Sequence, residues 1–382
     1  MIASLLTAAV LTGVAQADQL NPAYIPQDAK WVFHVDAEKL TSSAFAERFR
    51  EKHAEKAKRA RQWLKERYGI DPQDDLRSIT LFSNEYAPHT GTVILTADYD
   101  AAKVKEILEG VGASATDWED RQVYTHTVPT KKHDQKHAKG AKKDKKEKYK
   151  DKAHAAGDAD RGKAKQHDGA DDESSAAEKP KKEMASKSKH GRHKDGKHGK
   201  KTVATILFND ETIIFATDVE RAKAAVRLLE GEADSLENAD SKLITDYPTG
   251  AIMYGAAVDL DELSQKYARP FPVLSKHEHV NFAFGQRGDE LYDQLTLVAK
   301  DRDVAHEMED VLEGFVSLVK VCASDIPSVV DLYDDVEIDQ DGATVTVRWE
   351  GTVDDVMNAL DDIHPRLAEW KKMHHKRHHQ RY

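Results

Sequence analysis

The sequence predicts an α+β fold made of two similar halves, with antiparallel sheets covered by helices and a long, disordered basic insertion in the first half. Two observations support this prediction. The same order of strands and helices occurs twice along the chain, and one segment differs sharply in composition from its surroundings. In the halves, 18–235 and 240–365, apolar runs of strand length precede stretches with helical periodicity.

Matching phrases mark corresponding points in the two halves. The segment 29–40 begins as an apolar strand and turns into a helix at VDAEKL, and 250–263 does the same at VDLDEL. Two further patterns, strand-turn-strand-helix and hairpin-helix, recur in the pairs 78–110 with 279–314 and 202–231 with 336–363. The order of elements therefore indicates an internal duplication.

The phrase Leu-Glu-Gly occurs three times, at 108–110, 229–231 and 312–314, each time after a helical pattern. Glycine is favoured directly after the last helical turn, because left-handed backbone angles cost it little. The phrase therefore predicts three helix ends. For the middle helix, Thr217 and Glu220 fit a capping box at its start.

The segment 43–68 has the pattern of a basic amphipathic helix. Phe45, Phe49 and Leu64 lie along one face, whereas Lys and Arg lie elsewhere. Such a helix can lie on an anionic membrane surface. The alternative is a helix that lays its apolar stripe across a sheet, and the strands that flank the segment favour this second interpretation.

Residues 1–17 have the pattern of a signal peptide. The apolar, uncharged run 2–14 precedes Ala-Gln-Ala, which predicts a mature chain that starts near Asp18 and is periplasmic or secreted. A buried N-terminal helix is the alternative. A single cysteine, Cys322, allows no internal disulfide. Because it follows an apolar helical run, we interpret it as a buried, inert thiol.

The start of the predicted mature chain carries a family resemblance. The sequence AKWVFHVD follows IPQDAK, and the strand-helix phrases come after it. In these features the chain resembles exported bacterial α+β proteins that have no assigned activity. The resemblance implies export and an α+β fold.

The segment 131–201 is the strongest compositional feature of the chain. It contains 24 Lys and Arg against 13 Asp and Glu, whereas the whole chain has a net charge of −11. It has almost no aliphatic residue larger than alanine, so it cannot bury enough apolar surface to offset the entropy of ordering. We therefore predict a disordered insertion between two strands.

Histidines gather in this insertion and in the basic tail, 371–382, which suggests weak, multi-site binding of zinc, nickel or copper. A specific metal cofactor site is not predicted, because fixed ligand spacing is missing and the neighbouring lysines repel cations. The histidines that we consider most able to bind metal are His190, His193, His198, His374, His375, His378 and His379.

Other partners can be weighed from the same composition. Nucleic acid is disfavoured, because Tyr149 is the only aromatic residue in the insertion that could stack on a base. An anionic cell-surface polymer, lipid headgroups or the acidic remainder of this chain fit better, and a solvated charged spacer is the simplest interpretation. We predict no transmembrane segment in the mature chain.

Enzyme signatures are weak. The segment HEMED at 306–310 has Asp310 where a zinc-protease helix has its second histidine. The buried face of this helix is expected at the apolar positions Val304, Met308, Val311, Leu312 and Phe315. His306 and Asp310 would then face water. His277 and His279 could share one metal from alternate strand positions, or simply lead into a strand. His34 could act as a base beside Asp36, or be a hydrogen-bonded core residue.

The sequence therefore supports two functional hypotheses. The first is an exported, non-enzymatic protein of the cell envelope that binds or organises an unknown partner, with the insertion and tail as contact regions. The second is an exported metal-dependent hydrolase whose site is assembled from distant residues of the folded body.

Overall fold

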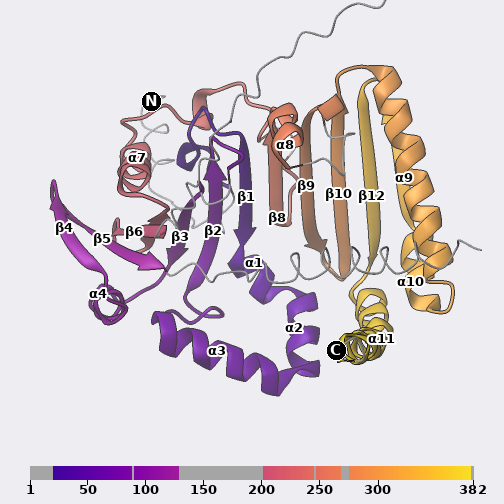
Figure 1. Cartoon of the computed structure of the whole chain (residues 1–382), viewed down its shortest axis with the longest axis horizontal. Helices are drawn as coiled ribbons and strands as arrows, with labels where there is room; N and C mark the ends of the chain where they lie inside the picture. The colour runs from indigo at the N-terminus through magenta and orange to yellow at the C-terminus, as the bar shows by residue number, and fades with distance from the viewer. Residues whose placement is uncertain (1–19, 88–89, 129–200, 245–246, 268–274, 380–382) are drawn as a thin grey trace, which may run out of the picture. The chain divides into compact units, whose positions relative to one another are not determined.

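The computed structural model describes residues 20–87, 90–128, 201–244, 247–267 and 275–379, and shows an α+β fold built on one large antiparallel sheet (Figure 1). The predicted signal peptide and almost all of the predicted insertion lie outside these residues. The sheet has 12 strands: β1 (Trp31–Asp36), β2 (Leu76–Ser83), β3 (Thr92–Ala97), β4 (Ser114–Trp118), β5 (Arg121–Val128), β6 (Lys201–Leu207), β7 (Thr212–Ala216), β8 (Ala251–Val258), β9 (His277–Arg287), β10 (Glu290–Ala299), β11 (Val336–Asp341) and β12 (Thr344–Thr352).

The helices are distributed among these strands along the chain. The described α-helices are α1 (Ala37–Ser42), α2 (Ala44–Lys52), α3 (Ala54–Tyr68), α4 (Ala101–Gly110), α7 (Val219–Leu229), α8 (Leu260–Tyr267), α9 (Arg302–Cys322), α10 (Pro327–Asp334) and α11 (Val353–His379). Helix α10 and strand β4 are elements that the sequence patterns did not indicate. Two short 3-10 helices span Pro22–Tyr24 and Leu236–Asn238. Among the described residues, none of the helices is both long and apolar enough to cross a bilayer.

The strands lie in the order β11-β12-β10-β9-β8-β1-β2-β3-β7-β6-β5-β4. The antiparallel β1–β8 pair joins the strands of the first half to those of the second, with Phe33 opposite Gly255. The predicted change from strand to helix at VDAEKL is confirmed: Asp36 ends β1, and its carboxylate accepts a 2.8 Å hydrogen bond from the amide of Lys39 at the start of α1. At VDLDEL, β8 is likewise followed by α8.

Apolar clusters attach several helices to the sheet. Ala222 and Val226 of α7 pack with Ile206 and Ile214 of the sheet, and Met308 of α9 packs with Val345 of β12. Because side chains alternate between the two faces of a strand, each cluster forms from one face only. These contacts place α7 over β3, β6 and β7, next to the candidate site.

The predicted helix end at Leu-Glu-Gly is correct for two of the three phrases. Gly231 follows α7 with a φ angle of 75°. Gly110 is the last residue of α4, although Gly112 rather than Gly110 has the positive φ. Gly314 lies in the middle of α9, because helix-forming residues continue after it and an exposed glycine costs only about 1 kcal/mol.

The cap of α7 also differs from the predicted capping box by one position. Asp218, rather than Thr217, caps the helix, and its carboxylate accepts a 2.9 Å hydrogen bond from the amide of Arg221. Aspartate caps a helix at least as well as threonine, so the chain uses the residue that directly precedes the helix.

The segment 43–68 forms two helices rather than one, because the chain leaves helical angles at His53. The expectation that its apolar stripe lies across the sheet is wrong for α3. None of the described side chains of α3 is buried, and its main neighbours are α2 and α4. Its few apolar residues are spread among many charges, so no face is apolar enough to hold it on the sheet.

Candidate functional site

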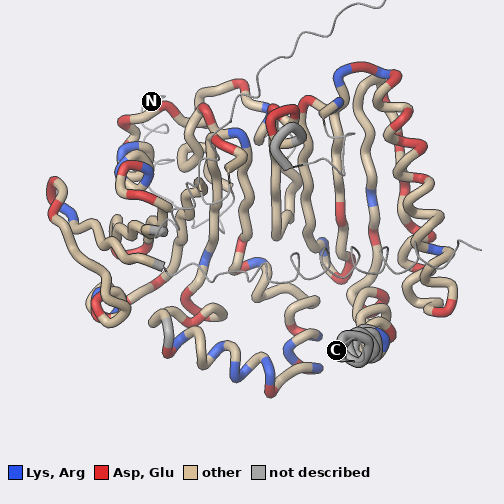
Figure 2. Tube along the Cα trace, in the orientation of Figure 1, with Lys and Arg blue, Asp and Glu red and all other residues tan. Residues whose placement is uncertain are grey.

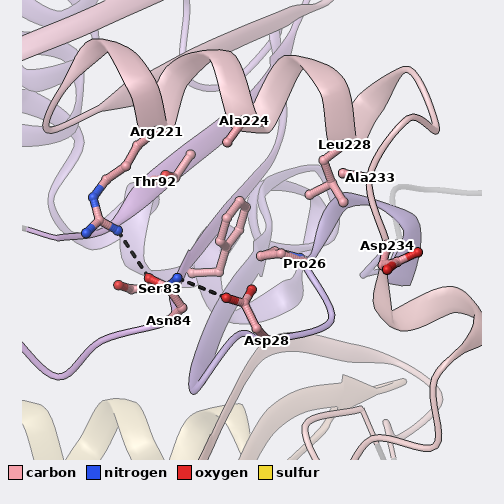
Figure 3. A pocket seen from close by; sticks show the side chains of 12 residues that line it. Pro26, Asp28, Ser83, Asn84, Thr92, Arg221, Ala224, Leu228, Ala233 and Asp234 are labelled. Atoms are coloured by element: carbon pink, nitrogen blue, oxygen red, sulfur yellow. Dashed lines mark hydrogen bonds between the residues drawn. The ribbon is translucent and has the colours of Figure 1, made fainter.

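A cavity of about 280 Å³ lies between α7 and the strands β2 and β3 (Figure 3). Phe82 of β2 and Thr92 of β3 are directly paired in the sheet and supply its floor. Ala224 and Leu228 of α7 supply the opposite wall. Because alanine is short, the helix leaves open space over the sheet at this point.

Arg221 closes one side of this cavity, and three polar side chains hold it in place. Its guanidinium donates to Asp218 at 3.1 Å, to Asn84 at 3.2 Å and to Glu85 at 2.6 Å. Asn84 in turn donates to Asp28 at 3.0 Å (Figure 3). A guanidinium with three partners is a fixed part of the wall.

Two carboxylates lie at the rim, and both belong to segments that the fold brings together. A single bridge between Pro26 and Ser235, and a 3.0 Å bond from the amide of Gln27 to the carbonyl of Asp234, place Asp234 close to Asp28. Asp234 is exposed, and no ion pair joins its carboxylate to another described residue. The rim therefore has acidic groups without a neutralising cation.

Thr92 places a hydroxyl at the floor. Only 4% of the residue is exposed, and its hydroxyl has no hydrogen-bond partner among the described residues. Because this hydroxyl lines the cavity and has no described partner, it can bond to a ligand atom or a water there. The ionisable side chains of the lining are Asp28, Asp234 and Arg221.

His277, at the start of β9, lines a second, polar pocket of about 630 Å³. Only 1% of this histidine is exposed. Three lysines surround it, and each one bonds to a carboxylate; the pairs are Lys30–Glu262, Lys242–Glu278 and Lys300–Asp261. The hydrogen bond from Lys242 lowers the pKa of Glu278. The five carboxylates of the lining outnumber its three lysines, so the pocket is net acidic, and His279 does not line it.

His34 is a buried core residue, as the second interpretation predicted. Its Nδ1 lies 2.9 Å from the hydroxyl of Thr80 on the neighbouring strand. Asp36 is fully buried, caps α1 and pairs with Lys39 at 2.7 Å, so its carboxylate has a structural role. Neither residue lines one of the described pockets discussed above.

On α9, the prediction that His306 and Asp310 face water is confirmed, because both are exposed. The expected burial of Val311 and Phe315 is wrong: these side chains are 54% and 56% exposed. Cys322 is also exposed, which corrects its interpretation as a buried thiol. The C-terminal half of α9 is apolar around much of its circumference, so periodicity could not identify the buried face.

The proposed metal ligands are only partly placed. His190, His193 and His198 lie outside the described residues, and for the four tail histidines, in 374–379, only the helical backbone of α11 is described. In the described part of the chain, no group of three or more His, Cys, Asp or Glu side chains is arranged to hold a metal ion. The proposed weak metal binding thus stays a prediction.

The outer side of α3 is a second candidate interface. Lys56, Arg59 and Trp63 follow one another at helical spacing, and Trp63 is 56% exposed. We call these three residues, together with Tyr68, whose ring lies 5.9 Å from that of Trp63, the α3 outer face. Its two basic side chains form no ion pair with a described acid. Figure 2 shows basic positions recurring along this helix.

An acidic loop holds α3 in position. Asp71 accepts two hydrogen bonds from Arg61, at 2.7 and 2.9 Å, and one from Lys65 at 3.1 Å. The hydrogen bond from Arg61 lowers the pKa of Asp71 to about 2. A helix with no buried side chain thus keeps a fixed orientation through a nearly buried carboxylate.

Comparison with known proteins gives little guidance. No protein-family model matches the chain, and no curated protein matches it in sequence. Solved structures of TP0453 in crystal forms III, I and IV align with it at 8%, 7% and 9% identity, with TM-scores of 0.40, 0.39 and 0.40. The alignments cover 90%, 90% and 92% of this chain and 99%, 97% and 100% of the others.

Proposed function

We propose that this protein is an exported, non-catalytic protein of the cell envelope that binds an anionic lipid surface through the α3 outer face. The observation that carries this proposal is the exposure of Trp63 beside unpaired basic side chains on a helix without buried residues. Because α3 touches the rest of its chain only on the side of α2, α4 and the Asp71 loop, its outer face is left open to a partner.

Charge and aromatic content together favour lipid over a soluble polyanion. Segment 44–68 contains nine Lys and Arg and four Glu, although the whole chain is acidic. Basic residues attract anionic headgroups, at about 1 kcal/mol for each one near the surface. Trp63 and Tyr68, 56% and 49% exposed, have the amphipathic rings that suit the boundary between headgroups and acyl chains.

The predicted insertion 131–201 and tail 371–382 would add basic contacts to the same partner. Export is part of this proposal, and rests on the apolar run before Ala-Gln-Ala. N-terminal sequencing of protein from the native organism is the direct test. We expect a mature chain that starts near Asp18, whereas an intact Met1 in a cytosolic fraction would contradict export.

We further propose that the two halves arose by duplication. In its support, β1 and β8 pair antiparallel, and each leads outward through its next two strands, β2–β3 on one side and β9–β10 on the other. The strand that follows outward is β7 in the first half and β12 in the second, each the last strand of its half. The VDAEKL and VDLDEL phrases occupy corresponding places.

Sedimentation with vesicles tests the lipid proposal. We expect the full chain to bind vesicles in which about one lipid in three is anionic, and to bind purely zwitterionic vesicles weakly. Binding should decrease strongly in about 1 M salt, because the charges are exposed. Equal binding to both kinds of vesicle, or none at low salt, would overturn the proposal.

Matched variants locate the contact. The double variant Lys56→Glu/Arg59→Glu should lower vesicle partitioning at least about tenfold. Trp63→Ala should lower partitioning by a smaller factor, and this factor should be the same at low and high salt. The control Lys105→Glu/Arg227→Glu makes the same charge change on exposed residues of α4 and α7. If the control weakens binding as much, net charge rather than the α3 outer face is responsible.

A further inference from the structure

The cavity under α7 has the size of a small-molecule site. Its volume of about 280 Å³ corresponds to roughly nine water molecules at their volume in the liquid. It is not continuous with α3, so it is independent of the proposed lipid contact: its lining comes from the segment 26–28, from β2 and β3, and from 221–234. A ligand here would touch both the helix and the sheet.

The inner part of the cavity favours an apolar body. Phe82 and Leu228 are both nearly buried and present ring and methyl groups, and Pro26 and Ala225 add further carbon surface. Burying apolar ligand surface here would contribute about 25 cal/mol for each Å² removed from water. The unbonded hydroxyl of Thr92 offers one hydrogen bond to a polar atom of the same ligand.

The rim favours a positive charge. Arg221 is the single basic side chain in the lining, and Asp218 and Glu85 already neutralise it. Asp28 and Asp234 add two carboxylates, of which Asp234 pairs with no described residue. Figure 3 shows Asp234 at the end of the cavity away from Arg221, with Asp28 between them and bonded to Asn84. An ammonium group between Asp28 and Asp234 would be close to two negatively charged hydrogen-bond acceptors.

We propose that this cavity binds a small primary amine whose apolar body lies between α7 and the sheet and whose ammonium group lies at Asp28 and Asp234. The same chemistry occurs in a free amine and at the N-terminus of a peptide with an aromatic or aliphatic first residue. A peptide fits only if the rim leaves room for its chain to continue outward past the two carboxylates, whereas a free amine needs no such exit.

Calorimetric titration of the full chain at low salt tests the proposal. The probes are 2-phenylethylamine, its uncharged counterpart 2-phenylethanol, and the tripeptide amide Phe-Gly-Gly. We expect saturable one-to-one binding of the amine, at least about tenfold tighter than the alcohol, because one ion pair is lost. Binding of the amine without the peptide identifies a free small molecule, and binding of both identifies a site open to a peptide N-terminus.

Variants separate binding from folding. Asp234→Asn should weaken the amine at least about fivefold and leave the alcohol unchanged, since its carboxylate has no partner in the described fold. Ala224→Leu, on the exposed side of α7, should block the cavity and abolish binding of both probes. Arg227→Leu places the same side chain elsewhere on the exposed surface of α7 and should change neither.

Thr92→Val provides a readout that a purely structural residue would not give. Because the hydroxyl has no described partner, its replacement by a methyl should leave the melting temperature unchanged or raise it, while weakening the amine by a few-fold. Three results would overturn the proposal: no saturable binding of the amine up to millimolar concentration, equal affinity for amine and alcohol, or unchanged binding in Ala224→Leu.

Discussion

Arg61 and Asp71 form a two-point ion pair that fixes α3 to the loop before β2. The Asp71 side chain is 2% exposed and the Arg61 side chain 37%, so the pair is sheltered on one side only. In most helices a buried apolar face holds the helix against the rest of the protein. Since α3 has no buried described side chain, the Arg61–Asp71 pair and Lys65 hold it in position. The position of the α3 outer face therefore depends on one carboxylate.

Asp71→Asn should destabilise the protein by about 1–2 kcal/mol, after allowance for the exposure of Arg61. Urea unfolding at neutral pH measures this change. Asp74→Asn is the matched control, because Asp74 bonds to the same guanidinium but is 60% exposed; we expect it to cost less than about 0.5 kcal/mol. Equal effects of the two variants would show that burial of Asp71 is unimportant.

The same pair gives a pH dependence. The folded pKa of Asp71, about 2, lies below its ordinary value of 3.8, so the unfolded chain binds a proton at higher pH than the folded chain does. The stabilisation is complete above about pH 5 and is lost as pH falls toward 2. In Asp71→Asn, the free energy of unfolding should decrease less between these values than in the unsubstituted protein.

Asp293 should show the opposite dependence. It lies on β10 between Phe284 and Trp349, its Oδ1 is buried without a partner in the described structure, and burial raises its pKa to about 6. The folded chain therefore retains a proton that the unfolded chain releases from about pH 4 upward, so stability is lost as pH rises through 6.

Asp293→Asn removes the charge at nearly constant volume. We expect it to stabilise the protein by about 1–2 kcal/mol at pH 8 and to have little effect at pH 4, where the carboxyl is already protonated when folded. Thermal unfolding across this pH range measures both. Asp339→Asn, on the exposed face of β11, is the control and should leave the slope unchanged. A stability loss at pH 8 would mean that the carboxylate has a partner after all.

The strand-helix phrases could be predicted because they are local: alternating apolar residues run directly into a capping aspartate such as Asp36. Gly314 could not be predicted as a helix interior, because the decision depends on Phe315–Cys322, which continue the helix. The cavity joins Asp28, Thr92 and Arg221, which are far apart in sequence, so no local pattern indicates it.

One missed feature did leave a signal in the sequence. In the run ELYDQLTL, Asp293 occupies the same alternation as Leu291 and Leu295, which places a carboxylate on an apolar face of the sheet. A charged residue at an apolar position of a strand indicates burial with a shifted pKa. The basic pattern of 43–68 was recognised, but its exposure could not be, because exposure depends on what the sheet leaves uncovered.

The exposure of Cys322 predicts fast reaction with thiol reagents. In the folded protein, the rate with a disulfide reagent such as DTNB should lie within about threefold of the rate in urea-unfolded protein, because no folding step is needed to reach the sulfur. Cys322→Ser should abolish the reaction and leave stability within about 0.5 kcal/mol, as expected for an exposed position. A reaction rate more than about 100-fold slower in the folded protein than in the unfolded protein would indicate that the thiol is buried.

The histidine-rich segments predict weak metal binding that can be removed in parts. Deleting 131–201 should lower the number of zinc or nickel ions bound, and removing 371–382 should lower it further, because each segment brings its own histidines. Affinity should decrease below about pH 6, where protonated imidazole cannot bind a metal. Calorimetric titration of the full chain, the two single deletions and the double deletion measures the stoichiometry of each.

His277→Ala should change none of these values, since no three-ligand group forms around it in the described residues. One tight ion that persists in the double deletion and disappears in His277→Ala would contradict this, and would support a metal-dependent hydrolase in the folded body.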